Sequence, residues 1–406
     1  MTLRIFDTLS LRKKVFRVDG KAVRMFLCGP TLYDYCHLGH ARTFVAFDII
    51  ARYLQYLGYR TKVIMNVTDM SHDVLKSAEH VGQSAAEYSD KYYLSLIEDL
   101  KALGISTVDS IVRASDNVPQ MIAWIERLLD RGVAYVTDEG VFLDTSKVRG
   151  YGQLSHQSKA ELALRRLELS PDKKYPEDFL VWNKIRTEKN IWDSPWGRGR
   201  PGQHIEDAAT CTRNLGTSYD INGGGDELVF PHHEAVKAQV EAVTGAPLCR
   251  YWLHTGLLRV RKRKMSKSLR NFITIRSALT RYDAPSLRLY FSLTHYRKPL
   301  DFRKCDLERA VRMSRRIRES VKYMKRPTVH PKVLSTDEHL DQMISRFKAE
   351  FLGAMDDDFN TEKAVKELLD FTGQVMMHHR HKWLSLGDLS KAVRSLAELG
   401  GILGIL

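Results

Sequence analysis

The sequence predicts an α/β fold of the doubly wound, nucleotide-binding kind, and three neighbouring segments near its start carry this prediction. Residues 22–27 form a short apolar run that fits a buried strand, and a Cys-Gly-Pro-Thr loop follows it. Apolar residues then recur on one helical face from 47 to 57, just before Gly58, which suits a left-handed helix end. Residues 62–67 have the pattern of the next strand. Strand, loop, helix and strand are the repeating unit of doubly wound folds.

The rest of the chain continues the alternation, is interrupted once, and ends in helices. Ser84 and Glu87 have the spacing of a capping box, which marks the start of a helix. Residues near 132–200 have the pattern of an insertion that ends in a loop rich in glycine and proline. Only helices are expected from about Asp301 onward. The other expected elements are helices over 84–105, 117–129 and 205–215, strands at 134–136, 141–143 and 219–221, and a helix that starts at Pro231.

Composition excludes several classes of protein. The 406 residues contain no apolar run of 18, so we expect no membrane-spanning helix, and the first residues lack the apolar core of a signal peptide. Five cysteines without a Cys-x-x-Cys pair argue against a disulfide scaffold. These features favour the cytoplasm. A net charge of +14 permits a polyanionic partner, although a solvated basic surface is the commoner cause.

Two short motifs point to chemistry on phosphates. His37-Leu38-Gly39-His40 lies where the first helix should begin, and helix N-termini favour phosphate. The two imidazoles could donate hydrogen bonds to a phosphoryl group, and Gly39 would let adenine or ribose approach the backbone. Far downstream, Lys264 and Lys267 in a Lys-Met-Ser-Lys-Ser segment could neutralise a triphosphate. Together, in this order, the two motifs are typical of class I aminoacyl-tRNA synthetases.

The chain resembles the cysteinyl-tRNA synthetase family over nearly its whole length. The resemblance rests on these segments: FLCGPTLYDYCHLGH at 26–40, NVTD at 66–69, WDSPWG at 192–197, FPHHE at 230–234, KMSKS at 264–268, THYR at 294–297 and DDDFNT at 356–361.

The resemblance implies a Rossmann-type class I catalytic domain with an inserted connective domain, followed by an all-α bundle that contacts the tRNA stem. We expect the first catalytic half at 1–115, the insertion at 116–202, the second catalytic half at 203–300 and the bundle at 301–406. The chain stops soon after the bundle, so no counterpart of the family's anticodon-binding domain is expected.

The resemblance also implies ATP and Mg²⁺ as requirements, with cysteine activated as an adenylate before transfer to tRNA. His37, His40, Lys264 and Lys267 would be the catalytic residues. Gly29, Gly39, Glu227 and Ser268 would bind ATP, with Glu227 facing the ribose.

The amino-acid pocket departs from the family. Its zinc ligands are two cysteines, a histidine and a glutamate, of which Cys28 and His232 remain, while Asp207 and Val236 replace the others. The losses favour absence of zinc, and Cys28, Asp207 and His232 are the residues that would hold it. Asp207 could instead hold a polar group of the substrate, and Cys28 could be a small buried hydrophobe. We expect the pocket residues to be Tyr33, Thr68, Gln203, His204, Asp207, Asn222 and Val236.

Three functions compete at this point. The altered pocket predicts a ligase that activates an amino acid other than cysteine and passes it to a small-molecule amine. The alternative is a cysteine–tRNA ligase with a divergent zinc site, which the basic charge favours. A non-catalytic nucleotide- or tRNA-binding module is the third, and the intact ATP motifs argue against it. The basic run at 259–264 is either a solvated hairpin or a contact for tRNA or ATP.

Overall fold

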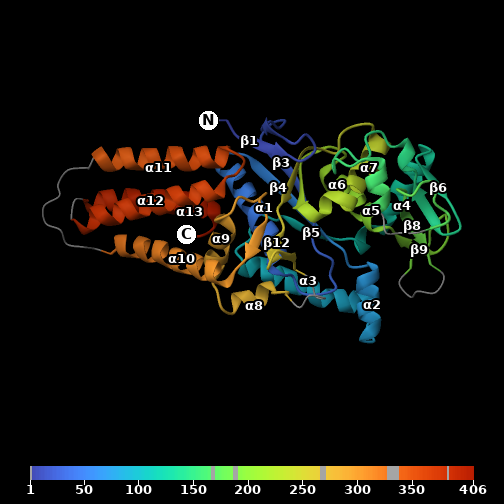
Figure 1. Ribbon diagram of the computed structural model, residues 1–406, viewed down its shortest axis with the longest axis horizontal. Helices are drawn as coiled ribbons and strands as arrows, with labels where there is room; N and C mark the ends of the chain where they lie inside the picture. The colour runs from blue at the N-terminus through green and yellow to red at the C-terminus, as the bar shows by residue number, and fades with distance from the viewer. Residues whose placement is uncertain (1, 166–169, 186–190, 266–270, 327–337, 382–383) are drawn as a thin grey trace.

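A five-stranded parallel sheet forms the centre of the molecule in a computed structural model (Figure 1). The structure describes residues 2–165, 170–185, 191–265, 271–326, 338–381 and 384–406. Its strand order is β11-β10-β3-β4-β5, and every neighbouring pair is parallel. The strands are β3 (Ala22–Leu27), β4 (Arg60–Val67), β5 (Ser110–Arg113), β10 (Tyr219–Gly225) and β11 (Cys249–Thr255). The predicted doubly wound fold is therefore confirmed.

The helices between these strands follow the apolar periodicity of the sequence. Ser84 caps α3 and shares a reciprocal capping box with Glu87, as their spacing predicts. Gly58 follows α1 with a φ of 89°, the left-handed conformation expected there. The helices are α1 (Leu38–Tyr56), α2 (His72–His80), α3 (Ala85–Ala102), α4 (Val118–Asp130), α5 (Lys159–Arg165), α6 (Gln203–Leu215), α7 (Glu234–Thr244), α8 (Ile275–Leu279) and α9 (Ala284–Ser292).

The order of the sheet reverses between β3 and β10, and this reversal locates the site. In open α/β sheets, ligands bind outside the carboxyl ends of the strands at such a point. Cys28, the first residue after β3, donates its backbone N–H to the Gly223 carbonyl of β10 at 2.9 Å. The ends of these two strands therefore meet at the crevice where a ligand is expected.

The glycine triplet lies inside β10, whereas the sequence suggested a strand that ends at 221. Each glycine accommodates a side chain packed against the strand. A Cβ at Gly223 would lie 2.1 Å from the Phe47 ring, and one at Gly224 would lie 2.9 Å from His233. A Cβ at Gly225 would lie 2.4 Å from the Glu227 carboxylate. The triplet is strand because close packing requires it, and not because the residues favour a turn.

The stretch expected to be an insertion contains a separate antiparallel sheet, seen at the right of Figure 1. Its strands are β6 (Ala134–Val136), β7 (Gly140–Leu143), β8 (Phe179–Lys184) and β9 (Gly199–Pro201). Smaller pairings join β1 (Arg4–Asp7) with β2 (Arg12–Val15), and β12 (Leu258–Val260) with β13 (Arg263–Lys264) and β14 (Leu300–Phe302). The basic run thus forms an antiparallel hairpin, with Arg261 and Lys262 at positive φ in its turn.

Four helices form the carboxyl-terminal bundle, seen at the left of Figure 1. They are α10 (Lys304–Met324), α11 (Glu338–Asp356), α12 (Thr361–Arg380) and α13 (Leu386–Leu403). Arg288 of α9 is buried and bonds both the Leu403 carbonyl, at 2.9 Å, and Asp48 of α1, at 2.6 Å. Tyr53 of α1 donates to Asp356 of α11 at 2.8 Å. These buried contacts fix the bundle to α1, the helix that begins at the candidate site.

Among the residues that the structure describes, no helix combines the length and the apolar character that crossing a bilayer requires.

Candidate active site

The first helix begins with two histidines that cap each other. His37 is the N-cap of α1, and its Nδ1 accepts the backbone N–H of His40 at 3.2 Å. The Nδ1 of His40 accepts the backbone N–H of His37 at 3.3 Å, and the two rings stack 3.9 Å apart. Because each Nδ1 accepts a hydrogen bond, a neutral ring carries its proton on Nε2. The pair therefore offers two Nε2–H donors at the positive end of a helix.

The segment after the lysine motif hydrogen-bonds to the segment that carries these histidines. Leu38 donates its N–H to the Ile273 carbonyl at 2.9 Å, and Ile275 donates to the Cys36 carbonyl at 2.8 Å. A pocket beside the start of α1 is lined by His37, Gly39, Thr43, Glu227, Thr255, Gly256, Leu257, Leu258 and Met265. His37 and Gly39 of the first motif and Met265 of the second thus line one pocket. Lys267 and Ser268 lie outside the described residues, and Lys264 is placed by its backbone in β13.

The glycines expected to bind ATP sit at close approaches. A Cβ at Gly39 would lie 2.7 Å from the His37 ring, so the group that approaches its backbone is that imidazole. A Cβ at Gly29 would lie 1.8 Å from the Asn66 carbonyl oxygen, and the Gly29 N–H donates to Asn66 Oδ1 at 2.9 Å. Neither position has room for a side chain, and both keep the backbone beside the pocket compact.

Buried polar pairs build the expected amino-acid pocket. Asn66 donates from Nδ2 to Asp207 Oδ1 at 2.6 Å, and Thr68 donates to Glu206 Oε2 at 2.6 Å. Asn222 accepts from Tyr219 at 2.6 Å, while its Nδ2 has no partner among the described residues. Strand β4 with the residue that follows it, strand β10, and the amino-terminal half of α6 position these side chains.

Not every expected pocket residue lies with this group. Gln203 is exposed at the start of α6, and Val236 is 1% exposed within an apolar cluster between α7 and its neighbours. Tyr33 is half-buried, and its carbonyl accepts a hydrogen bond from Tyr88 at 3.0 Å. The replacement at 236 therefore extends the apolar core at a position where the family has a metal ligand.

Four potential metal ligands lie close together at the expected amino-acid pocket. Cys28, Asp207, His232 and His233 are buried, and one ligand atom from each lies within 4.8 Å of all the others. Asp207 Oδ2 lies 3.0 Å from His232 Nε2 without the alignment of a hydrogen bond. That Oδ2 and the Nε2 of His233 have no hydrogen-bond partner among the described residues. Thiolate, carboxylate and imidazole are all zinc ligands, so this group fits a zinc ion.

Burial favours the uncharged forms of two groups in the cluster, the Cys28 thiol and the His233 imidazole. Burial and the neighbouring Asp207 carboxylate raise the pKa of the Cys28 thiol well above its ordinary value. Burial likewise raises the pKa of Glu206. Burial, followed by the three nearby imidazoles, lowers the pKa of His233, and burial lowers that of His254 to about 3. A cation in the cluster would oppose the shift at the thiol.

Four residues that contact the cluster or the pocket had no role assigned from the sequence: Asn66, Glu206, His233 and His254. His204 was expected there, and its Nδ1 lies 2.9 Å from that of His232. Asn66 could have been found, because it is the one polar residue in the buried half of β4, residues 63–67, at the carboxyl edge of the sheet. His254 sits inside strand β11 and is distinguished from core by its contacts to His233 and to Thr8, each at 2.8 Å.

Comparisons with known proteins agree with this arrangement. Residues 14–312 match the model of the class I (C) tRNA synthetase catalytic domain, and residues 350–406 match the DALR domain. Solved structures share the fold at low identity. A Mycobacterium tuberculosis methionyl-tRNA synthetase has a TM-score of 0.68 at 13% identity, covering 95% of this chain and 90% of that one.

Curated relatives match along the whole chain. The cysteine–tRNA ligase of Hahella chejuensis is 40% identical over 404 residues, covering 99% of this chain and 85% of its own. That of Pyrococcus horikoshii is 38% identical, covering 100% of this chain and 87% of its own. The family match extends over both the catalytic domain and the bundle. The chain therefore belongs to the class I aminoacyl-tRNA synthetases of the cysteinyl family.

Proposed function

We propose that the protein is a cysteine–tRNA ligase that activates cysteine with ATP and transfers it to tRNA. The observation that carries this proposal is the buried cluster of Cys28, Asp207 and His232 at the carboxyl edge of the sheet. The relatives named as cysteine–tRNA ligases support it. Neither the family match nor these relatives support the expected non-cysteine substrate or small-amine acceptor, so the alternative weighed from the sequence is preferred.

Charge neutralisation and positioning are the main contributions of the ATP site. His37 and His40 donate from Nε2 to phosphate oxygens as charge develops on them. Glu227 is exposed at the rim of the pocket, where its carboxylate can accept from the ribose hydroxyls. Lys264 and Lys267 would hold the leaving pyrophosphate, and Mg²⁺ would help to neutralise its charge.

Selection of cysteine needs more than pocket shape, because one small group in an apolar pocket discriminates by only about 1–3 kcal/mol. Zinc bound by Cys28, Asp207 and His232 would supply a soft cation that favours a substrate thiolate over a hydroxyl. Asn66 holds the Asp207 carboxylate by one oxygen, at 2.6 Å, and leaves the other directed at the cluster. This arrangement supports Asp207 as a ligand of the proposed zinc ion.

One observation favours a second candidate, activation of a different amino acid. Glu206 and Asp207 place two buried carboxylates in the pocket, and the Nδ2 of Asn222 is a buried donor without a partner among the described residues. Such groups suit a polar or cationic substrate side chain. Zinc content separates the candidates, because only the first needs a metal.

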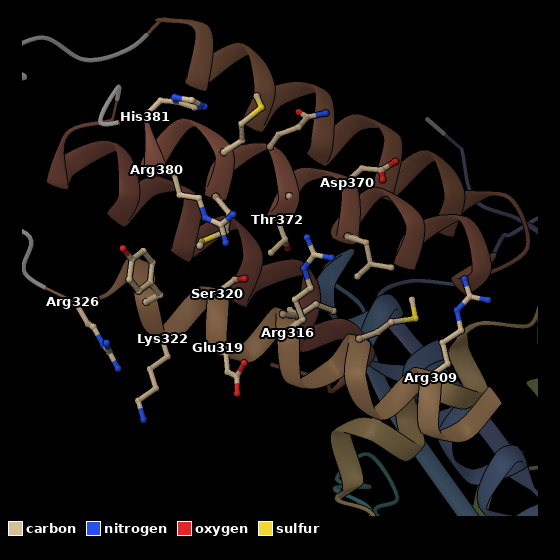
Figure 2. Close-up of a pocket in the computed structure, with 18 residues that line it drawn as sticks. Arg309, Arg316, Glu319, Ser320, Lys322, Arg326, Asp370, Thr372, Arg380 and His381 are labelled. Atoms are coloured by element: carbon tan, nitrogen blue, oxygen red, sulfur yellow. The ribbon is translucent and has the colours of Figure 1, made fainter. Parts of the chain in front are cut away.

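A groove in the helical bundle supports tRNA as the acceptor. It lies between α10 and α12, encloses about 1180 Å³ and is lined by five exposed cations (Figure 2): Arg309, Arg316, Lys322, Arg326 and Arg380. None of the five forms an ion pair with another described residue. Unpaired cations along a groove are available to phosphates of an RNA backbone.

Charging assays test the proposal. Transcripts of tRNA for cysteine should accept cysteine. The double replacement Arg316→Ala/Arg380→Ala should make tRNA binding less dependent on salt. The slope of the logarithm of the binding constant against the logarithm of the salt concentration should fall by roughly one unit for each phosphate that the protein no longer neutralises. Lys348→Ala on α11 is the matched control, because Lys348 is paired with Glu398 and does not line the groove. Failure to charge any tRNA, with exchange of pyrophosphate intact, would contradict tRNA as the acceptor.

A further inference from the structure

The second histidine of the His232–His233 pair lies where it can replace a missing ligand. The family's fourth ligand, a carboxylate, corresponds to Val236, which is buried in apolar core and cannot bind a metal. We propose that His233 Nε2 supplies the fourth ligand of the cluster, and that His254 and Thr8 are the positioning residues that fix its ring. This inference rests on the metal-bound form of the proposed function.

The position of His233 supports this assignment. Its ring is fully buried, and a ligand atom of it lies within 4.8 Å of those from Cys28, Asp207 and His232. Nε2 has no hydrogen-bond partner among the residues described, although a buried polar atom left unpaired costs about 1–3 kcal/mol. Gly224 packs against the same edge, because a Cβ there would lie 2.9 Å from Cε1 and 3.4 Å from Nε2. The ring is therefore held in place with one nitrogen near the other ligand atoms, and Nε2 is the nitrogen that His254 does not engage.

Two further hydrogen bonds can set the tautomer of this ring. His233 Nδ1 lies 2.8 Å from His254 Nε2, and His254 Nδ1 lies 2.8 Å from Thr8 Oγ1. If His233 donates from Nδ1, then His254 accepts on Nε2 and donates from Nδ1 to the hydroxyl oxygen. This direction leaves a lone pair on His233 Nε2. The opposite direction would place a buried N–H on His233 Nε2, beside the other ligand atoms. A cation in the cluster therefore selects the direction in which His233 donates from Nδ1.

The resulting donor set differs in charge from that of the family. Two thiolates and a carboxylate carry three negative charges in the family's set. Here one thiolate and one carboxylate carry two, and two neutral imidazoles complete the four ligands. All are accepted zinc ligands, and four is the number that zinc usually takes. The loss of two family ligands therefore does not predict loss of the metal, because His233 is already in place.

Zinc affinity of the full-length chain tests the proposal. The metal-free protein is titrated with Zn²⁺ in competition with a chromogenic chelator. His233→Asn keeps an atom at the place of Nδ1, and so the contact with His254, but has none at the place of Nε2. We expect its affinity to fall by more than the roughly 10–100-fold that loss of an outer-shell partner costs. His378→Gln, which alters a buried histidine of α12, should bind zinc as the unaltered chain does.

A matched pair at His254 tests the positioning role. His254→Gln keeps an amide oxygen at the place of Nε2 and should bind zinc within a few-fold of the unaltered chain. His254→Asn has no atom there and should lose roughly 10–100-fold. Equal affinities for the two variants would remove His254 from the proposal. Circular dichroism of each metal-free variant separates loss of the ligand from loss of the fold.

The outcomes also separate this proposal from the proposed function. Zinc binding that is lost in Cys28→Ser but unchanged in folded His233→Asn would overturn the role of His233 and leave the metal site standing. No zinc binding by the unaltered, folded chain would overturn the metal site itself, and with it both conclusions. Loss in both variants, with His378→Gln unaffected, is the result that the structure predicts.

Discussion

The reciprocal capping of His37 and His40 predicts that structure and catalysis can be separated by two substitutions at one position. His40→Asn keeps an oxygen at the place of Nδ1, which can still accept the His37 N–H, but has no donor at the place of Nε2. His40→Gln keeps a donor near Nε2 and loses the cap. Loss of a helix cap costs about 0.5–2 kcal/mol of stability. Loss of a donor to a developing oxyanion costs about 10²–10³-fold in rate.

We therefore expect His40→Asn to unfold close to the unaltered protein and to lose about 10²–10³-fold in ATP–pyrophosphate exchange. His40→Gln should be the less stable and the more active of the two. Thermal unfolding and exchange rates, measured on the same preparations, provide the comparison. Normal exchange by His40→Asn would refute the assignment of Nε2 as a phosphate donor. Equal losses of stability in both variants would refute the capping argument.

Three other predictions follow from single sites. Lys267→Ala should reduce exchange at least about 10²-fold, and an undiminished rate would contradict a role in holding pyrophosphate. Asp48→Asn should lower the free energy of unfolding by about 3–5 kcal/mol in chemical denaturation, because it removes the charge that pairs with buried Arg288 at 2.6 Å. Lys298→Ala, which breaks an exposed ion pair, should lower it by under about 1 kcal/mol. Burial lowers the pKa of His295 from 6.5 to about 4, so the unfolded chain binds more protons in that window and stability falls as the pH drops from 6.5 toward 4. His295→Gln should make the free energy of unfolding, measured by urea titration at each pH, depend less on pH in this window. An unchanged dependence on pH would contradict the role of His295.

The periodicity of apolar residues in the sequence was sufficient to predict the first strand–helix–strand unit of the parallel sheet. Strand β3, helix α1 and strand β4 lie within a few residues of the predicted ranges, because each buries a continuous apolar face. The glycine triplet was the clearest difference. Its strand conformation depends on Phe47 and His233, which approach from distant segments, and no local pattern reports such contacts.

The part of the candidate site that consists of sequence motifs could be predicted. The part that depends on the packing of distant segments could be predicted less well. His37 and Glu227 were expected at ATP, and the fold brings both to one pocket. The place of Val236 in apolar core and the unpaired Nε2 of His233 could not be read from the chain, because both depend on how α7 lies against the sheet. The sequence showed which ligands had changed but not which neighbour was available to replace them.

Activation of each amino acid, measured together with the metal content of the same preparation, tests the central claim most directly. Pyrophosphate exchange into ATP is followed for the full set of amino acids, and zinc is counted per chain. Our account predicts cysteine as the preferred substrate, about one zinc per chain, and loss of both in Cys28→Ser. Preference for another amino acid by a zinc-free enzyme would contradict it.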